Sequence, residues 1–168
     1  MRLVGVGASV VAIAASFACS APADSPDAGP PSLELGTGIR SFETLADGGS
    51  IFIVQGPQGG YHFFGSLRAQ NINSGDSEDL SDSQNPQTTF EAFVGDTRVD
   101  AMASSYRQGL FVDGGFAQML GRQVILDILD DDELDGAMVR FTVTVEDASG
   151  IVLTDERSLT AIKHPDNQ

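Results

Sequence analysis

The chain has 168 residues, with 24 Asp and Glu against 9 Lys and Arg, so its formal net charge is −15. A surface with such an excess of carboxylates repels nucleic acids and anionic lipid headgroups, which excludes electrostatic binding of DNA or RNA as a main activity. Cationic partners, metal ions among them, remain compatible with this charge. The length suits one domain with a substantial core.

Residues 1–18 have the layout of a secretory signal peptide. An early arginine is followed by an uncharged, mostly apolar segment, and small residues precede Cys19, the only cysteine of the chain. A cysteine at this place resembles the lipidation site of bacterial lipoproteins. The resemblance implies palmitate or a similar acyl chain on Cys19, which would anchor the protein in the cell envelope, at the outer membrane. Cleavage by an ordinary signal peptidase, after Ala18 or after Ala23, is the alternative, and it predicts a secreted or periplasmic protein.

The remaining sequence divides into three parts. Residues 19–33, which start at the lipidated cysteine, are rich in Pro, Ala, Ser and Asp, and this composition predicts a flexible, extended tether. Residues 34–163 consist of short apolar segments separated by turn residues, which indicates one folded domain. Residues 164–168 are polar and predict a disordered tail.

The domain has the pattern of an all-β fold. In residues 138–146 the apolar and polar side chains alternate, and a turn at residues 147–150 leads into residues 151–162 as the hairpin partner. In this partner the alternation fails at residues 155–157, which indicates a β-bulge or a charged edge. The other clear strands are predicted at residues 50–55, 61–69, 88–94 and 122–129. About seven to eight short strands of this kind predict an antiparallel β-sandwich.

Two resemblances extend this interpretation. The closing hairpin, residues 135–162, is similar to the last two strands of bacterial immunoglobulin-like and fibronectin type III-like domains, which implies an immunoglobulin-like sandwich. A second set comprises residues 34–38, Phe42, Leu45, residues 47–48, residues 56–62 and Arg68. This set resembles an arrangement that recurs in uncharacterised lipoproteins of myxobacterial type. It implies a location and a fold but no reaction, because a fold alone does not determine function.

A glycine-rich loop before a histidine is the first candidate for a ligand-binding site. Gly56, Gly59 and Gly60 permit a sharp change of chain direction, and Pro57 fixes one backbone angle within it. Such a loop would hold His62 at a defined position, and histidine is the commonest metal ligand among side chains. The alternative is a simple connection between two strands, with His62 on the outward face of its strand.

An acidic segment between two predicted strands is a weak candidate for a metal site. Asp131, Glu133 and Asp135 lie at alternate positions, as in a calcium loop. An EF-hand would need a bidentate Glu where the chain has Thr142, and it would need helices on both sides. The alternative is a solvated turn in which Leu134 packs inward.

The long polar segment at residues 71–86 predicts a mobile loop. Loops of this length are often functional, and a weak cation site is conceivable at its acidic residues, Asp76, Glu78, Asp79 and Asp82.

No enzyme signature is present in the sequence, which lacks a Gly-x-Ser-x-Gly elbow, a His-Glu-x-x-His pair and a Walker loop. We therefore expect no catalytic residues, no cofactor and a non-enzymatic binding or scaffolding role in the cell envelope. The expected partners are the membrane, through the N-terminal lipid anchor, and an envelope protein. The alternative function is an envelope metal-binding protein that uses His62 or the acidic segment.

Overall fold

The computed structural model describes residues 29–101 and 104–167, so the predicted signal peptide and Cys19 lie outside the described residues. The described residues form eleven β-strands and one short 3₁₀ turn, η1 (Asp131–Glu133). None of the helical structure in this part of the chain is long and apolar enough to cross a membrane.

The strands follow one another along the whole described chain. They are β1 (Ser32–Thr37), β2 (Glu43–Thr44), β3 (Ser50–Gln55), β4 (Tyr61–Gln70), β5 (Gln87–Val94), β6 (Thr97–Arg98), β7 (Ser104–Arg107), β8 (Phe111–Asp113), β9 (Phe116–Ile125), β10 (Met138–Glu146) and β11 (Val152–Lys163). The prediction of an all-β domain is confirmed, and the predicted strand at residues 138–146 has the observed bounds of β10.

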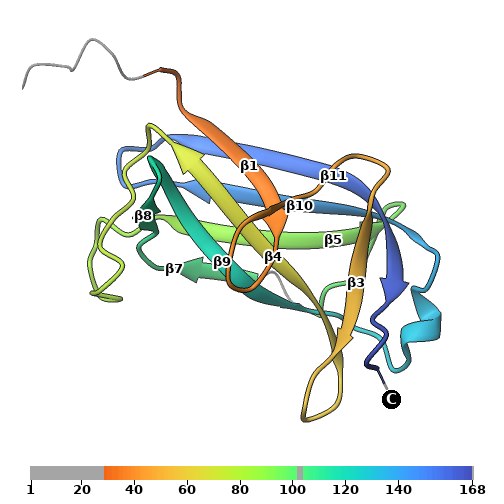
Figure 1. Cartoon of the computed structure of the whole chain (residues 1–168). Helices are drawn as coiled ribbons and strands as arrows, with labels where there is room; N and C mark the ends of the chain where they lie inside the picture. Colours follow the sequence, from red (N-terminus) through yellow and green to blue (C-terminus); the bar gives the residue numbers. More distant parts are fainter. Residues whose placement is uncertain (1–28, 102–103, 168) are drawn as a thin grey trace, which may run out of the picture.

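All strands belong to one hydrogen-bonded sheet, which folds over into two layers (Figure 1). One layer contains β1, β4, β9 and β8, and the other contains β11, β10 and β5. Strand β3 joins the layers, because its first residues pair in parallel with β11 and its last two pair antiparallel with β4. The sheet is therefore mixed and has eleven strands, whereas the sequence predicted a purely antiparallel sandwich with seven to eight. The parallel pair joins β3 and β11, which lie far apart in the chain. The strands that the sequence did not predict are mostly two to six residues long.

The core lies between the two layers and is centred on aromatic side chains. Phe63 of β4 and Phe141 of β10 meet edge to face across it, with 5.8 Å between ring centroids, and Phe90 of β5 stacks on Phe141. The next residue on the inner face of β4, Gly65, lets the layers approach, because a Cβ on Gly65 would lie 2.8 Å from the Phe90 ring. Alternate residues of β4 and β10 thus fill the core as the period-two pattern predicts.

Strand β9 differs most from its prediction. It begins at Phe116 and ends at Ile125, whereas the sequence predicted a strand at residues 122–129. The apolar alternation is interrupted at Gly121, which has a φ angle of +62°, and opposite this place the β4–β9 register shifts between Gly65 and Leu67. The irregularity hides the first half of the strand from a period-two analysis.

The segment of β11 at residues 155–157 is a charged edge and not a bulge. Its ladder with β10 runs without a shift from Val152 to Thr160, and a second strand partner, β3, begins only at Thr160. Along the unpaired part, the Asp155 carboxylate accepts a hydrogen bond from the main-chain N–H of Leu35 in β1, at 2.8 Å. The broken alternation therefore marks side chains that connect the two layers.

Both ends of the domain are longer than predicted. Strand β1 already begins at Ser32, within the predicted tether. At the other end, the Asn167 amide donates to the Ile53 carbonyl at 2.9 Å and to the Asp131 carboxylate at 2.8 Å, and its oxygen accepts from the Gln55 N–H. Residues 164–167 thus pack against β3 instead of forming a disordered tail.

Candidate functional site

The glycine-rich loop forms the tight end of the β3–β4 hairpin. The N–H of Gly59 donates to the carbonyl of Gly56, and the N–H of Gly56 donates to the carbonyl of Gly60, both at 3.0 Å. Gly59 and Gly60 have φ angles of +81° and +73°, which favour glycine. The turn itself accounts for these glycines.

His62 follows this turn, but its side chain is buried. It is 4% exposed and packs edge to face against Phe64, with 4.6 Å between ring centroids. Its Nε2 has no hydrogen-bond partner among the described residues, and burial lowers the pKa of the imidazole because it penalises the charged form. A hollow of about 310 Å³ beside the ring is lined by the loop, Gln123 and Ile125. Within the described residues, no other metal-ligating side chains gather around His62.

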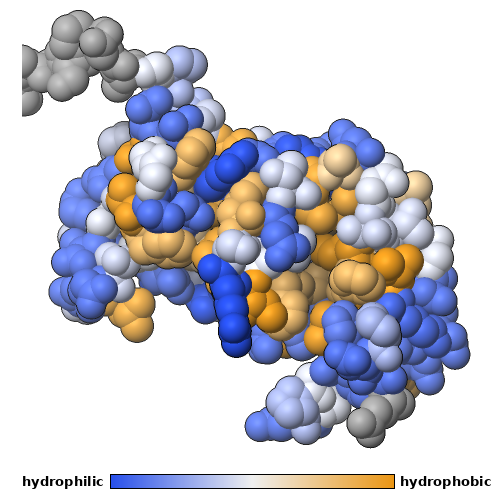
Figure 2. Space-filling view, in the orientation of Figure 1, coloured by the Kyte–Doolittle hydropathy of each residue, from blue (hydrophilic) through white to orange (hydrophobic). Residues whose placement is uncertain are grey.

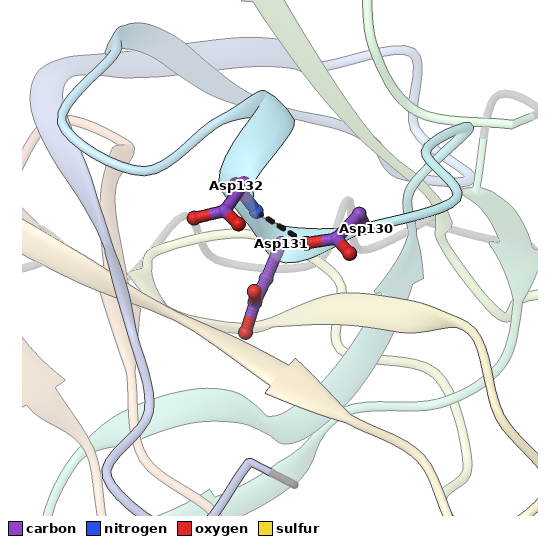
Figure 3. Close-up of side chains that lie close together, drawn as sticks. All are labelled: Asp130, Asp131 and Asp132. Atoms are coloured by element: carbon purple, nitrogen blue, oxygen red, sulfur yellow. Dashed lines mark hydrogen bonds between the residues drawn. The ribbon is translucent and has the colours of Figure 1, made fainter.

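The acidic segment forms a capped turn around η1. The Asp130 carboxylate accepts from the N–H of Asp132, and the Glu133 carboxylate accepts from the N–H groups of Leu129 and Asp130. This is a capping box, in which both side chains satisfy main-chain donors at the start of the turn. Figure 3 shows that the three aspartate side chains leave the turn in different directions.

A lysine already supplies the cation of this acidic cluster. Lys163 bonds both Asp131, at 2.9 Å, and Asp132, while its main-chain N–H donates to Asp135. The hydrogen bonds from Lys163 and then from Asn167 lower the pKa of the Asp131 carboxyl, and the carboxylates in turn raise the pKa of Lys163. The predicted metal candidates Asp131, Glu133 and Asp135 are therefore all engaged by protein groups.

The polar segment at residues 71–86 is held in place, in contrast to the predicted mobile loop. Buried Asn85 accepts from the Asp76 N–H at 2.8 Å and donates to the Asp79 carbonyl at 2.7 Å. The Asp147 carboxylate, in the β10–β11 turn, accepts from the Asn73 N–H at 2.8 Å. The other acidic side chains predicted as a weak cation site mostly cap local turns, as Asp79 does for Ser81.

A groove of about 840 Å³ lies on the surface at a place that no sequence motif marked. It is lined by the β1–β2 loop, by β3 and by Phe64 of β4. Its apolar lining includes Phe52, which is 47% exposed, and Ile39, which is 59% exposed. Figure 2 shows apolar surface over β3 and the middle of β4, surrounded by hydrophilic surface. Arg40 and Glu43 add charge of both signs to the lining.

The groove exists because the sheet opens at this place. Strand β3 pairs with β4 only through Val54 and Gln55 and then turns toward β11. Strand β1 pairs with the other end of β4, from Gly36 to Ser32. Between β3 and β1, no strand of the described chain lies beside the edge of β4 near Phe64. One signal was available in the sequence: Phe52 and Val54 alternate with Ile51 and Ile53, so β3 is apolar on both faces.

Comparison with protein-family models, with curated proteins and with solved structures found no match to this chain.

Proposed function

We propose that this chain is a lipid-anchored binding protein of the bacterial cell envelope, whose ligand occupies the groove between the β1–β2 loop and β3. The observation that carries the proposal is the exposure of Ile39 and Phe52 in a concave site on a chain of net charge −15. Apolar side chains gathered on a hydrophilic surface are typical of an interaction site, and concave sites of several hundred Å³ are typical of ligand binding.

A binding role is favoured over catalysis by the way the polar candidates are used. His62 is shielded from solvent, and Glu133 and Asp130 cap a turn. Asp131 is neutralised by Lys163. These groups stabilise the fold, whereas the groove presents mostly apolar surface, which provides contact area.

The anchor is proposed from the resemblance of Cys19 to a lipoprotein acceptor cysteine. From Cys19 to the start of β1 there are 13 residues, and a proline-rich tether of this length would span about 40 Å at about 3.1 Å per residue. Ser32 lies at the end of β1 that pairs with Gln70, and the groove is lined by Thr37 at the opposite end. The tether therefore leaves the domain far from the groove, which suits a site that must reach an envelope protein.

We assign the finer fold as immunoglobulin-like, in keeping with the resemblance of the closing hairpin. The strand order supports this assignment: β4, β9 and β8 are neighbours in one layer, and β11, β10 and β5 are neighbours in the other. In immunoglobulin-like sandwiches the second, fifth and fourth strands share one sheet, and the third, sixth and seventh share the other. If β3 is counted as the first strand and β5, β6 and β7 together as the third, then β4, β9 and β8 are the second, fifth and fourth strands. The other layer then contains the third, sixth and seventh strands, which are β5, β10 and β11.

Two measurements test the proposal. Metabolic labelling with an alkyne analogue of palmitate is expected to mark the wild-type chain and to be lost in Cys19→Ser; label retained in the variant would contradict the anchor. The groove is tested with Nile red, a neutral apolar dye, added to the unlipidated Cys19→Ser chain. Phe52→Asp is expected to weaken dye binding at least tenfold.

The matched control for the groove is Val112→Asp on β8, because Val112 is 67% exposed and lies outside the groove. It places the same charge on another exposed strand. Dye binding that is absent, or that falls equally in both variants, would contradict a ligand site in the groove.

A further inference from the structure

One edge of β3 faces the groove with its main-chain groups. The N–H of Thr160 in β11 donates to the Gly49 carbonyl, and the N–H of His164 donates to the Ile53 carbonyl. Main-chain groups of a strand point to alternate sides, so the N–H and carbonyl groups of Ile51 and Ile53 face β11, as the Gly49 carbonyl does. Those of Ser50 and Phe52 face the other way, into the groove.

No described strand pairs with this edge. The ladder between β3 and β4 ends at Val54 and His62. The next outward-facing carbonyl of β4, that of Phe64, accepts a hydrogen bond from the Thr37 hydroxyl at 2.8 Å. The groove therefore combines an unpaired strand edge with exposed apolar side chains beside it, and the edge of a sheet is a template for another extended chain.

We propose that the groove binds an extended polypeptide segment with alternating apolar and basic residues, which adds a strand to β3 beside Ser50 and Phe52. This inference rests on the proposed binding function and names the ligand of that site. In such strand addition the main chain supplies the affinity, and pockets for alternate side chains supply the specificity. Here one face of the added strand would contact Phe52 and Ile39.

The net charge of the molecule favours a basic peptide over an acidic one or a second copy of the chain. The groove lining contains one exposed acid, Glu43, and one exposed base, Arg40. Two further exposed acids lie at the ends of β3: Asp47 precedes it, and Asp166 lines a hollow with Gln55. The whole chain is strongly acidic, so a basic segment is attracted and a second copy of the same chain is repelled.

The experiment uses fluorescent heptapeptides of alternating lysine and valine, titrated into the unlipidated full chain and followed by anisotropy. Two further peptides carry N-methyl groups on every second amide, one in each register. We expect the added strand to run antiparallel to β3, because antiparallel pairing is the more stable kind. In this direction only one set of amides faces β3 while valine contacts Phe52, so one methylated peptide is expected to bind like the parent and the other at least tenfold more weakly. Equal binding of the two methylated peptides would overturn antiparallel strand addition.

Charge and site are tested with the same assay. A glutamate–valine heptapeptide is expected to bind at least tenfold more weakly than the lysine–valine peptide. Phe52→Asp replaces the apolar contact of the groove with a carboxylate. Because a carboxylate would also attract the lysine–valine peptide, the effect of this variant is measured with a neutral serine–valine peptide. This peptide is expected to lose at least tenfold in affinity for Phe52→Asp and to keep its affinity for the control Val112→Asp. Equal affinity of the acidic and basic peptides would overturn the choice of occupant.

The remaining outcomes separate the two proposals. If Nile red binds in the groove but no peptide does, the strand-addition inference fails and the binding function stands. If neither binds, both fail. Sedimentation of the free chain as a dimer that the lysine–valine peptide does not dissociate would identify a second copy as the occupant and overturn the inference.

Discussion

Replacement of Asp147 by alanine is expected to destabilise the domain and to release the long polar loop. The Asp147 carboxylate is buried in the β10–β11 turn and accepts four hydrogen bonds. The donors are the N–H of Asn73, at 2.8 Å, the N–H and hydroxyl of Ser149, at 2.9 and 2.6 Å, and the N–H of Ile151, at 3.0 Å. Asp147→Ala removes all four acceptor contacts at once.

The magnitude follows from the kind of bonds that are lost. A hydrogen bond to a charged group contributes about 1.5–3 kcal/mol, but exposed donors of the turn regain water when the carboxylate is removed. We therefore expect a loss of about 3 kcal/mol in the free energy of unfolding for Asp147→Ala, or roughly 9 °C in Tm for a domain of this size. Ser149→Ala removes only the hydroxyl donor and is expected to cost about 1 kcal/mol.

The same contacts make the loss of stability in Asp147→Ala depend on pH. Burial acts to raise the pKa of Asp147, but the hydrogen bonds from Ser149, Asn73 and Ile151 outweigh it and hold the pKa below its ordinary value. A pKa lowered on folding stabilises the folded state above the unfolded pKa of about 3.9, and this contribution disappears as the pH falls through the folded pKa. The difference between wild type and Asp147→Ala should shrink below about pH 4.

Urea unfolding followed by circular dichroism measures both effects, and native-state hydrogen exchange at the Asn73 amide shows whether the loop is released. Faster exchange at Asn73 is expected in Asp147→Ala, with little change in Ser149→Ala. Unchanged stability, or unchanged exchange at Asn73, would refute the assignment of Asp147 as the residue that fixes the loop.

Three other outcomes are expected from single substitutions. Gly65→Ala should cost about 1–3 kcal/mol in urea unfolding, because its Cβ would press on the Phe90 ring; unchanged stability would contradict the packing of the core. Lys163→Met should raise the pKa of the Asp131 carboxyl in an NMR titration, because Lys163 is the main cause of its lowered pKa; the same pKa as in wild type would disprove the ion pair. Because the pKa of His62 is lowered in the folded state, the unfolded chain binds a proton at a higher pH than the folded chain does. The free energy of unfolding should therefore fall as the pH drops below about 6.5, and it should fall less in His62→Phe. An imidazole pKa at or above 6.5 in an NMR titration would argue against burial of His62.

The regular part of the fold was predictable because it obeys local rules. Residues 138–146 alternate without interruption, and the observed β10 has the same bounds. The first half of β9 was missed because Gly121 breaks its pattern. The parallel pairing of β3 with β11 joins residues more than 100 positions apart, and no local pattern contains that information.

The candidate site was harder to predict than the fold. The carboxylates that a metal would need were visible in the sequence, but the contacts of Lys163 and Asn167 with Asp131 come from the end of the chain and depend on its packing. In the same way, residues 71–86 have a disordered composition but are held by Asn85 and Asp147. The groove depends on where β3 separates from β4, which is a property of the whole sheet.

The proposed binding site depends on the unpaired edge of β3. Hydrogen exchange of the individual β3 amides tests directly whether this edge is unpaired. In the free chain the amides of Ile51 and Ile53 should exchange slowly, because they bond β11, while the Phe52 amide exchanges quickly. Addition of the lysine–valine peptide should then protect Phe52. A Phe52 amide that is already as protected as Ile51 in the free chain, or one that stays unprotected with the peptide at saturation, would contradict the account.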